Sequence, residues 1–327
     1  MPIKGVIINL FIFNFSLIMK EFYFKLSLFI LFLFGLTILG FFLPVTPRGK
    51  QSLLFSQIFK DSLLTYSEST RIILIGGSNL SMGINSNLLK NELRLNPVNT
   101  SIHASIGLKY MMRHTLKFVK RGDVVIISPE YQQFFDDFAD GREELLRIIA
   151  DINKLEFLEL EFSQLLKICK LIPSYSFSKF KIQEYCYNKN ELFLYGADGY
   201  NKFGDYEKHW DLKPLNAPID DFRTQKYDPS VVKSIIKFRH DLNKMGADLY
   251  ITFPGYQNSS FRKNFKHINY INSILVINKF KILGEPSRYI IPDSLMYGTS
   301  YHLSKKAVDL RTNLLIEDFK MYKINKK

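Results

Sequence analysis

The sequence predicts an α/β domain with a doubly wound parallel sheet, preceded by one transmembrane helix. Three observations support this prediction. An uncharged apolar stretch lies near the N-terminus, at residues 26–43. Farther along the chain, short apolar runs rich in β-branched residues end in Gly or Pro, as buried parallel strands do. Amphipathic stretches with helical spacing alternate with these runs, and this alternation is typical of doubly wound sheets.

The composition is that of an ordinary folded protein. A chain of 327 residues with 46% hydrophobic content is long enough for one large domain and an anchor. The net charge of +13 comes from scattered basic residues that form no block or stripe, so we expect no nucleic-acid partner. Cys169 and Cys186 belong to no Cys/His cluster, so the sequence predicts no metal site. It leaves open whether the two cysteines form a disulfide.

Residues 26–43 predict a transmembrane helix, because 18 uncharged residues come close to the length that crosses a hydrocarbon core. The stretch is too long for a cleaved signal peptide, and no small-x-small cleavage site follows Pro44. Basic residues flank both ends, so the positive-inside rule discriminates weakly. The short segment before the helix favours a cytoplasmic N-terminus, residues 1–25, and an exported C-terminal domain.

Two segments beside this helix are more ambiguous. Residues 5–18 form a second, shorter apolar run. Either Met19 is the true start and residues 1–18 are a spurious extension, or the run is a short hairpin-like or interfacial segment. On the other side, residues 44–69 are rich in Pro, Ser, Thr, Gln and Lys, which predicts a juxtamembrane connector with room for one short helix.

The α/β domain is expected to cover residues 70–327, and its elements follow in order. The predicted elements are a strand from Arg71 ending in Gly76-Gly77, a helix over 107–119, a strand over 124–128 closed by Pro129, a helix over 229–244, a strand over 248–252 and a helix over 304–318. Residues 135–225 interrupt this rhythm with helical and aromatic segments. We interpret them as an insertion over the active-site face, since ligands bind at the carboxyl ends of parallel strands.

Two polar side chains are placed where serine chemistry needs them. Ser78 follows the first strand in Gly76-Gly77-Ser78-Asn79-Leu80, where glycines allow a sharp turn and a helix N-terminus would offer N–H groups to an oxyanion. A serine needs a base, and histidine is the usual one. His302 lies in a polar loop just before the last helix, which puts it at the end of the sheet. A structural loop and a helix-capping histidine are the alternative interpretations.

The combination of blocks supports a family resemblance. The matching stretches are Gly76-Gly77-Ser78-Asn79-Leu80, Asn99–Leu108, Gly122–Tyr131, Asn201–Asp205, Phe253-Pro254, Tyr301-His302-Leu303 and Arg311-Thr312. Their order resembles the SGNH (GDSL-like) hydrolase superfamily and, more closely, membrane-anchored SGNH-like proteins of bacterial surface-polysaccharide machinery. The resemblance implies a flavodoxin-like sheet, no cofactor, and a single-pass protein of the bacterial inner (cell) membrane with an extracytoplasmic domain.

The resemblance also implies a set of catalytic roles. Ser78 would be the nucleophile and His302 the general base, with the N–H groups of Ser78 and Asn79 and a donor near Gly107 forming an oxyanion hole. The chain departs from the family pattern in two places. Its Gly-x-Asn-Asp block is replaced by Pro129-Glu130-Tyr131, and the positions three and four residues before His302 are not acidic. The nearest carboxylate before His302 is that of Asp293, which we expect to orient the imidazole from a bent loop.

Other residues are weaker candidates, and three functions remain open. Glu130, Asp205, His209 and His103 are candidate substrate contacts, although lone histidines are more often structural. The first function is a serine esterase or O-acyltransferase acting on a surface glycan or lipid-linked saccharide, with other polysaccharide-assembly proteins as partners. The second is an inactive glycan-binding or scaffolding domain. The third, a phosphate-binding protein, lacks the usual motifs. An Asp293–His302 contact would favour the enzyme. A side chain that fills the space above Ser78 would favour the inactive glycan-binding domain.

Overall fold

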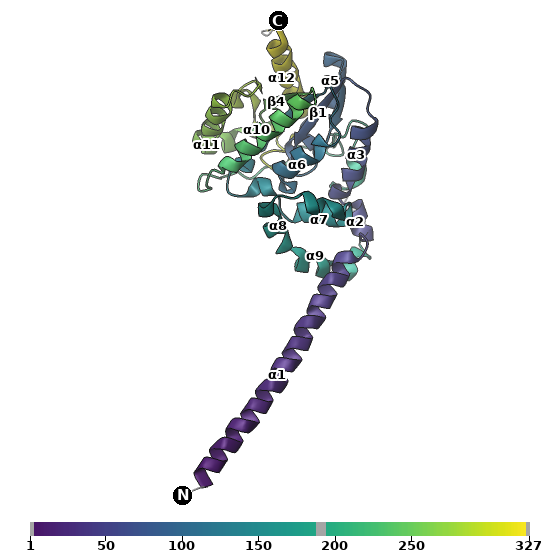
Figure 1. The fold of residues 1–327 in the computed structure, drawn as a ribbon. Helices are drawn as coiled ribbons and strands as arrows, with labels where there is room; N and C mark the ends of the chain where they lie inside the picture. The colour runs from purple at the N-terminus through teal and green to yellow at the C-terminus, as the bar shows by residue number, and fades with distance from the viewer. Residues whose placement is uncertain (1–2, 188–193, 325–327) are drawn as a thin grey trace.

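The computed structural model describes the backbone of residues 3–187 and 194–324, and the side chains of residues 18–187 and 194–324. One long helix, α1 (Ile3–Phe42), projects from a globular α/β domain (Figure 1). The helix runs without a break through both apolar runs, so the hairpin-like alternative for residues 5–18 is wrong. Between the runs, Met19, Lys20 and Glu21 are good helix formers, and Lys25 pairs with Glu21 one turn earlier at 2.7 Å.

The exposed part of α1 has the properties of a membrane span. Within residues 18–51, the most apolar window has a mean hydropathy of 2.6, and only 6% of that window is buried against the protein. Apolar side chains such as Leu31 and Phe34 are 65% and 61% exposed. The helix is both long enough and apolar enough to cross a bilayer, and the domain leaves its apolar side chains uncovered.

The juxtamembrane connector is more helical than the sequence predicted. It contains α2 (Pro47–Gln51), η1 (Leu53–Ser56) and α3 (Gln57–Tyr66). Thr46 caps α2 through its side chain, which accepts the N–H of Gly49 at 3.1 Å. The connector is ordered because it packs onto the domain, where Leu64 and Lys60 are fully buried.

A five-stranded parallel sheet forms the centre of the domain. Its order is β2 (Asn96–Asn99), β1 (Arg71–Gly76), β3 (Val124–Ser128), β4 (Asp248–Thr252) and β6 (Ile282–Leu283). All five strands run in the same direction, with Gly76 opposite Ser128 and Ile127 opposite Ile251. The strands β5 (Tyr256–Gln257) and β7 (Ile290–Ile291) form a separate small pair. The carboxyl ends of β1 and β3 therefore lie side by side, which brings Ser78 next to the residues that follow β3.

Four of the helices that pack beside the sheet form two contacting pairs. α6 (Leu108–Leu116) packs with α10 (Pro229–Lys244), and α5 (Ser86–Leu93) packs with α12 (Lys305–Ile324). The helix α11 (Asn258–Ile277) follows β5. The last helix, α12, leads away from α1 toward the C-terminus (Figure 1). The start of α12, which immediately follows the His302 loop, is therefore the end of this helix that is nearer to α1.

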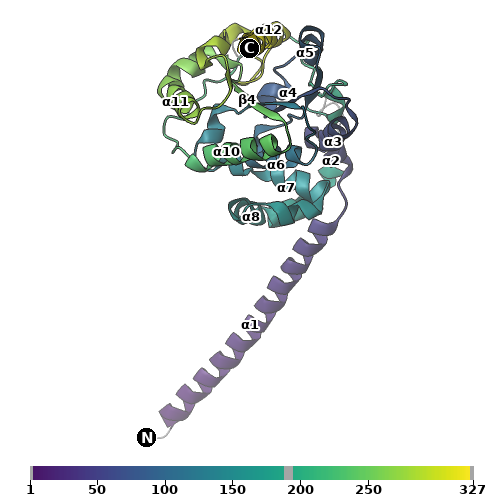
Figure 2. The ribbon, with the colours of Figure 1, turned by 45° about the horizontal axis from the view of Figure 1, so that its top comes forward.

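The described residues of the segment 135–225 form short helices and loops. It includes α7 (Glu143–Asp151), η5 (Lys154–Glu159), α8 (Phe162–Cys169), α9 (Ile172–Ser178) and η6 (Ile182–Glu184). Figures 1 and 2 show α7 and α8 on the side of the domain nearest to α1. The segment also borders the carboxyl edge of the sheet, where Arg142 N–H donates to the carbonyl of Ser105 at 2.8 Å. Cys169 and Cys186 are both exposed and carry free thiols.

Candidate functional site

The turn that carries Ser78 is built on close backbone approaches. β1 ends at Gly76, and Gly77 is the N-cap of α4 (Ser78–Ser81). A Cβ atom at Gly77 would lie 2.6 Å from Oε1 of Glu130 and 2.8 Å from Ala104, so only glycine fits. α4 is a single four-residue turn. The helix N-terminus at this serine is therefore a short one.

Asn79 locks this turn to the end of the neighbouring strand. Its side-chain Nδ2 donates to the carbonyl and to Oγ of Ser128 at 3.0 and 3.1 Å, and its Oδ1 accepts the N–H of Gly77 at 3.1 Å. Asn79 is fully buried. Three hydrogen bonds from one buried side chain fix the position of Ser78 relative to β3.

Glu130 is the residue in direct contact with the half-buried Ser78. The Ser78 hydroxyl donates to Oε1 of Glu130 at 3.3 Å, and the same oxygen accepts the backbone N–H of Asn79 at 3.1 Å. Burial raises the pKa of Glu130 to about 7; these two hydrogen bonds act in the opposite direction and the nearby Asp220 raises the pKa further. The serine therefore faces a carboxyl group that changes protonation near neutral pH.

A buried arginine lies behind this turn. Nη2 of Arg311 donates to Oγ of Ser128 at 3.1 Å and to the carbonyl of Phe253 at 3.2 Å. Its Nε and Nη1 are buried, with no hydrogen-bond partner in the described part of the chain. Burial lowers the pKa of Arg311 to about 10. Arg311 remains charged at neutral pH, so a positive group lies two hydrogen bonds from the Ser78 turn, through Ser128 and Asn79.

The loop that carries His302 is tied to the Ser78 turn by another histidine. Nε2 of His209 lies 3.2 Å from the carbonyl of Met82, just after α4, and 3.0 Å from that of Leu303. Thr299, at one of the positions where the family pattern has an acid, instead accepts the backbone N–H of His302 through Oγ1 at 3.0 Å. The structure thus brings His302 to the carboxyl edge of the sheet that Ser78 occupies.

His302 does not form a catalytic pair in this geometry. No hydrogen bond joins it to Ser78 among the described side chains, and its buried Nδ1 has no partner there either. Burial lowers the pKa of His302 to about 3, with further lowering by His209 and His103. The imidazole is therefore neutral at physiological pH, and no carboxylate of the described residues is hydrogen-bonded to it.

Two predicted parts of the machinery are engaged elsewhere. Both carboxylate oxygens of Asp293 accept hydrogen bonds from Ser259, from its N–H at 3.0 Å and from its hydroxyl, at the start of α11. The expected Asp293–His302 contact is thus replaced by a helix-capping contact. The N–H of Gly107 donates to the carbonyl of Ala104 at 2.9 Å, so it is not free to serve an oxyanion. Gly107 instead supplies the positive φ of 87° that starts α6.

Asp205 and His209 are structural rather than substrate-facing. Both are fully buried. Asp205 accepts the N–H and hydroxyl of Ser86, each at 2.7 Å, and the side-chain amide of Asn99 at 2.9 Å. His209 holds the two loops described above. His103 is the more accessible candidate, with 40% of its side chain exposed and Nδ1 3.9 Å from Glu144.

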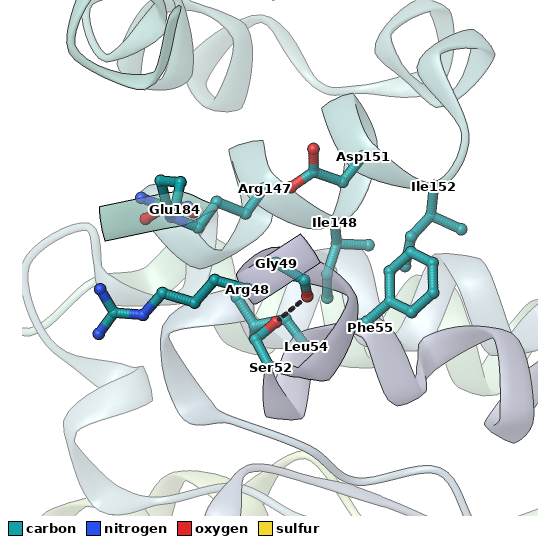
Figure 3. Close-up of a pocket in the computed structure, with 10 residues that line it drawn as sticks. All are labelled: Arg48, Gly49, Ser52, Leu54, Phe55, Arg147, Ile148, Asp151, Ile152 and Glu184. Atoms are coloured by element: carbon teal, nitrogen blue, oxygen red, sulfur yellow. Dashed lines mark hydrogen bonds between the residues drawn. The ribbon is translucent and has the colours of Figure 1, made fainter. Parts of the chain in front are cut away.

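A cavity of about 310 Å³ lies away from the Ser78 turn, between the juxtamembrane connector and α7 (Figure 3). Its lining includes Arg48, Ser52, Phe55, Arg147 and Glu184. In Figure 3 the side chain of Arg48 points away from the cavity. Over the described residues, no group of three His, Cys, Asp or Glu side chains is arranged to hold a metal ion.

The sequence predicts Glu130 only as a candidate substrate contact, and its hydrogen bond with Ser78 was not predicted. The parallel pairing of β1 and β3 makes the residue two places after β3 a natural neighbour of the residue two places after β1. Arg311 enters the sequence prediction only through the family resemblance, and nothing in its local sequence predicts burial.

Comparison with protein-family models finds no match for this chain, and comparison with curated proteins finds no significant relative.

Proposed function

We propose that the protein is a membrane-anchored serine esterase or O-acyltransferase that acts on a cell-surface glycan or lipid-linked saccharide through a Ser78 acyl-enzyme. The observation that supports it best is the hydrogen bond from Ser78 to Glu130, whose pKa of about 7 suits a general base at neutral pH. The exported, inner-membrane location is part of the same proposal. An anchor beside the site would hold it at high local concentration near assembling polymers.

The arrangement of the sheet supports an SGNH-like, doubly wound fold. Numbered along the chain without the small pair, the strand order is 2-1-3-4-5, which is the flavodoxin-like order. The two helix pairs, α6 with α10 and α5 with α12, suit cover on both faces. In such sheets ligands bind at the carboxyl ends of the strands, where Ser78 and His302 lie.

The geometry favours Glu130 over His302 as the group that accepts the serine proton. In the proposed step, Ser78 Oγ attacks the ester carbonyl carbon while its proton passes to the Glu130 carboxylate. The carbon–oxygen bond to the leaving alcohol then breaks, and that alcohol takes the proton from Glu130. Water or a sugar hydroxyl attacks the acyl-serine in the same way, giving hydrolysis or transfer. Movement of Glu130 would free the Asn79 N–H for the oxyanion.

A second candidate function is an inactive domain that binds glycan or scaffolds an assembly complex. Glu130 lies on both the Ser78 hydroxyl and the Asn79 N–H, where a substrate carbonyl would need to be. The unpartnered Nδ1 of His302 also favours this alternative. Such a domain would keep the turn geometry but show no activated serine.

The two functions are separated by labelling the full-length protein in detergent with a serine-reactive fluorophosphonate. The proposal expects labelling that is lost in Ser78→Ala and retained in Ser81→Ala, one turn farther along α4. Glu130→Gln should reduce labelling strongly, and Asp293→Ala should not, because that carboxylate caps α11. Loss in His302→Ala with retention in Glu130→Gln would return the base role to His302. Wild-type labelling no higher than that of Ser78→Ala would refute the enzyme and leave the binding function.

A further inference from the structure

Exposed apolar side chains are concentrated in one short segment of the domain, and we name this group the η5–α9 patch. It is formed by consecutive short helices between residues 154 and 185. Its members are Leu155 (73% exposed), Leu158 (86%), Phe162 (74%), Leu166 (51%), Phe177 (37%), Phe180 (46%) and Ile182 (70%). Exposed apolar residues scattered singly are ordinary, but a concentration of them on adjoining short helices indicates a surface that contacts something apolar.

This patch borders the last turns of α1. A Cβ atom at Gly40 would lie 2.4 Å from the carbonyl oxygen of Ser176, so α1 and α9 touch backbone to backbone. The ring of Phe41 packs edge-on against Tyr175 of α9 and Phe157 of η5, with centroids 6.1 and 5.7 Å apart. Phe157 lies between the exposed Leu155 and Leu158 in sequence, so the same short helix contacts α1 and presents the patch.

The depth of this contact places the patch at the level of the membrane surface. Gly40 and Phe41 belong to the uncharged stretch 26–43, whereas Lys20, Glu21 and Lys25 interrupt the apolar sequence earlier in α1. Leu36 and Thr37, one turn deeper, are already half-buried. A span of residues 26–43 therefore ends roughly 5 Å beyond the contact with α9, within the interfacial zone of a bilayer.

The polar residues around the patch suit the same environment. Lys170 and Lys181 are exposed beside it, after α8 and α9. The acidic side chains nearby are partly engaged, with Glu156 buried against His114 and Lys117, and Glu159 paired with Lys117 at 2.6 Å. Apolar side chains flanked by exposed lysines are the composition of segments that lie in the interface of an anionic bilayer.

We infer that the η5–α9 patch docks into the interface of the bilayer that α1 crosses, so that the domain lies on the membrane in a fixed orientation. This inference rests on the membrane span of the proposed function, and it is separate from the chemistry at Ser78. Figures 1 and 2 show α8 on the side of the domain that faces α1. Docking there would also turn the carboxyl edge of the sheet, where α12 begins, toward the membrane.

The test uses the full-length Cys186→Ser protein, with a fluorophore on the native exposed Cys169 at the end of α8. It is reconstituted in nanodiscs of phosphatidylcholine and phosphatidylglycerol, with and without lipids spin-labelled near the headgroup. We expect strong quenching by the spin-labelled lipid and weak quenching by aqueous iodide. A fluorophore at Ile277→Cys, with both native cysteines replaced by serine, should show the opposite behaviour.

Charge substitutions supply the matched control. The double variant Leu158→Glu/Phe162→Glu should reduce lipid quenching at Cys169 at least about threefold, whereas Ile277→Glu, at a 75% exposed residue of α11, should not change it. Iodide access at Cys169 equal to that at position 277 would overturn the docking. Shielding from both iodide and lipid would overturn it in favour of a protein partner. Recovery of the protein in nanodiscs tests whether α1 spans the membrane, and fluorophosphonate labelling tests whether Ser78 is an activated nucleophile. Failure of the membrane span, of the Ser78 chemistry or of the docking can therefore be told apart.

Discussion

The hydroxyl of Ser78 donates to Oε1 of Glu130 at 3.3 Å, while the backbone N–H of Asn79 donates to the same oxygen. One carboxyl group thus contacts both the proposed nucleophile and a proposed oxyanion donor. Its protonation state decides which contact matters. As a carboxylate it can accept the serine proton, and as a carboxylic acid it loses that capacity.

The pH dependence of serine labelling should distinguish the two candidate bases. Burial raises the pKa of Glu130 to about 7, so labelling that depends on its carboxylate should rise with pH through about 7. Burial lowers the pKa of His302 to about 3, so labelling that depends on neutral His302 should be flat from about pH 5 to about pH 9. Rates of fluorophosphonate labelling across this range provide the measurement.

The Glu130→Gln variant is the control for that profile. The amide keeps the shape of the side chain but does not titrate, so any remaining labelling should lose its rise near pH 7. A rise that persists unchanged in Glu130→Gln would show that another group titrates, and the assignment of Glu130 would be abandoned.

Gly77→Ala should disable the turn. The added methyl group would lie 2.6 Å from Oε1 of Glu130 and 2.8 Å from the backbone of Ala104, which cannot move aside cheaply. We expect Ser78 labelling to fall roughly tenfold or more and the melting temperature to drop. Gly35→Ala, in an exposed part of α1 with open space around it, is the matched control and should change neither property. Wild-type labelling in Gly77→Ala would contradict the tight approach of Glu130.

Asp205→Asn should reduce stability without changing the chemistry of Ser78. The buried carboxylate accepts two hydrogen bonds from Ser86 and one from Asn99, and an amide cannot accept all three. Thermal unfolding should occur at a lower temperature, while the labelling rate per folded molecule stays at the wild-type value. A selective loss of labelling at unchanged stability would restore Asp205 as a substrate contact.

The His114 cluster should make stability fall in mildly alkaline solution. Nε2 of His114 lies 2.8 Å from Asp61 and Nδ1 lies 3.0 Å from Glu156. Burial alone would lower the pKa of His114, but these carboxylates raise it to about 9. A pKa raised on folding stabilises the protein fully below about 6.5, and the contribution is lost as pH rises toward about 9.

The variant His114→Gln tests this linkage. It should lower stability by roughly 2 kcal/mol at neutral pH, because one buried and one partly buried hydrogen bond to charged groups are weakened. The decline of melting temperature between about pH 7 and about pH 9 should be shallower than in the wild type. An identical decline in both proteins would show that other groups govern alkaline stability.

The sequence predicted the elements that have a strong apolar or amphipathic pattern. The strands Arg71–Gly76, Val124–Ser128 and Asp248–Thr252 and the helix Pro229–Lys244 lie where periodicity placed them. Edge strands were missed, because Asn96–Asn99 contains a proline and polar residues and Ile282–Leu283 is only two residues long. Pairing with a neighbour, which local sequence does not encode, makes these segments strands.

The site was predicted in its backbone positions rather than in its contacts. Ser78 and His302 both lie at the carboxyl edge because strand direction and chain order require it. The partner of Asp293 depends on the start of α11, a helix that the sequence analysis did not assign, and the partner of Ser78 depends on the register between β1 and β3. Contacts that cross between elements follow from packing, which the sequence pattern alone does not specify.

The backbone contact between Gly40 and Ser176 connects α1 rigidly to the domain. A helix adjusts to a thinner or thicker bilayer by changing its tilt, and a flexible linker would absorb that change. Here the last turn of α1 packs directly against α9. A change in the tilt of α1 would therefore rotate the whole domain together with the helix. Bilayer thickness would then set the angle at which the carboxyl edge of the sheet meets the membrane plane.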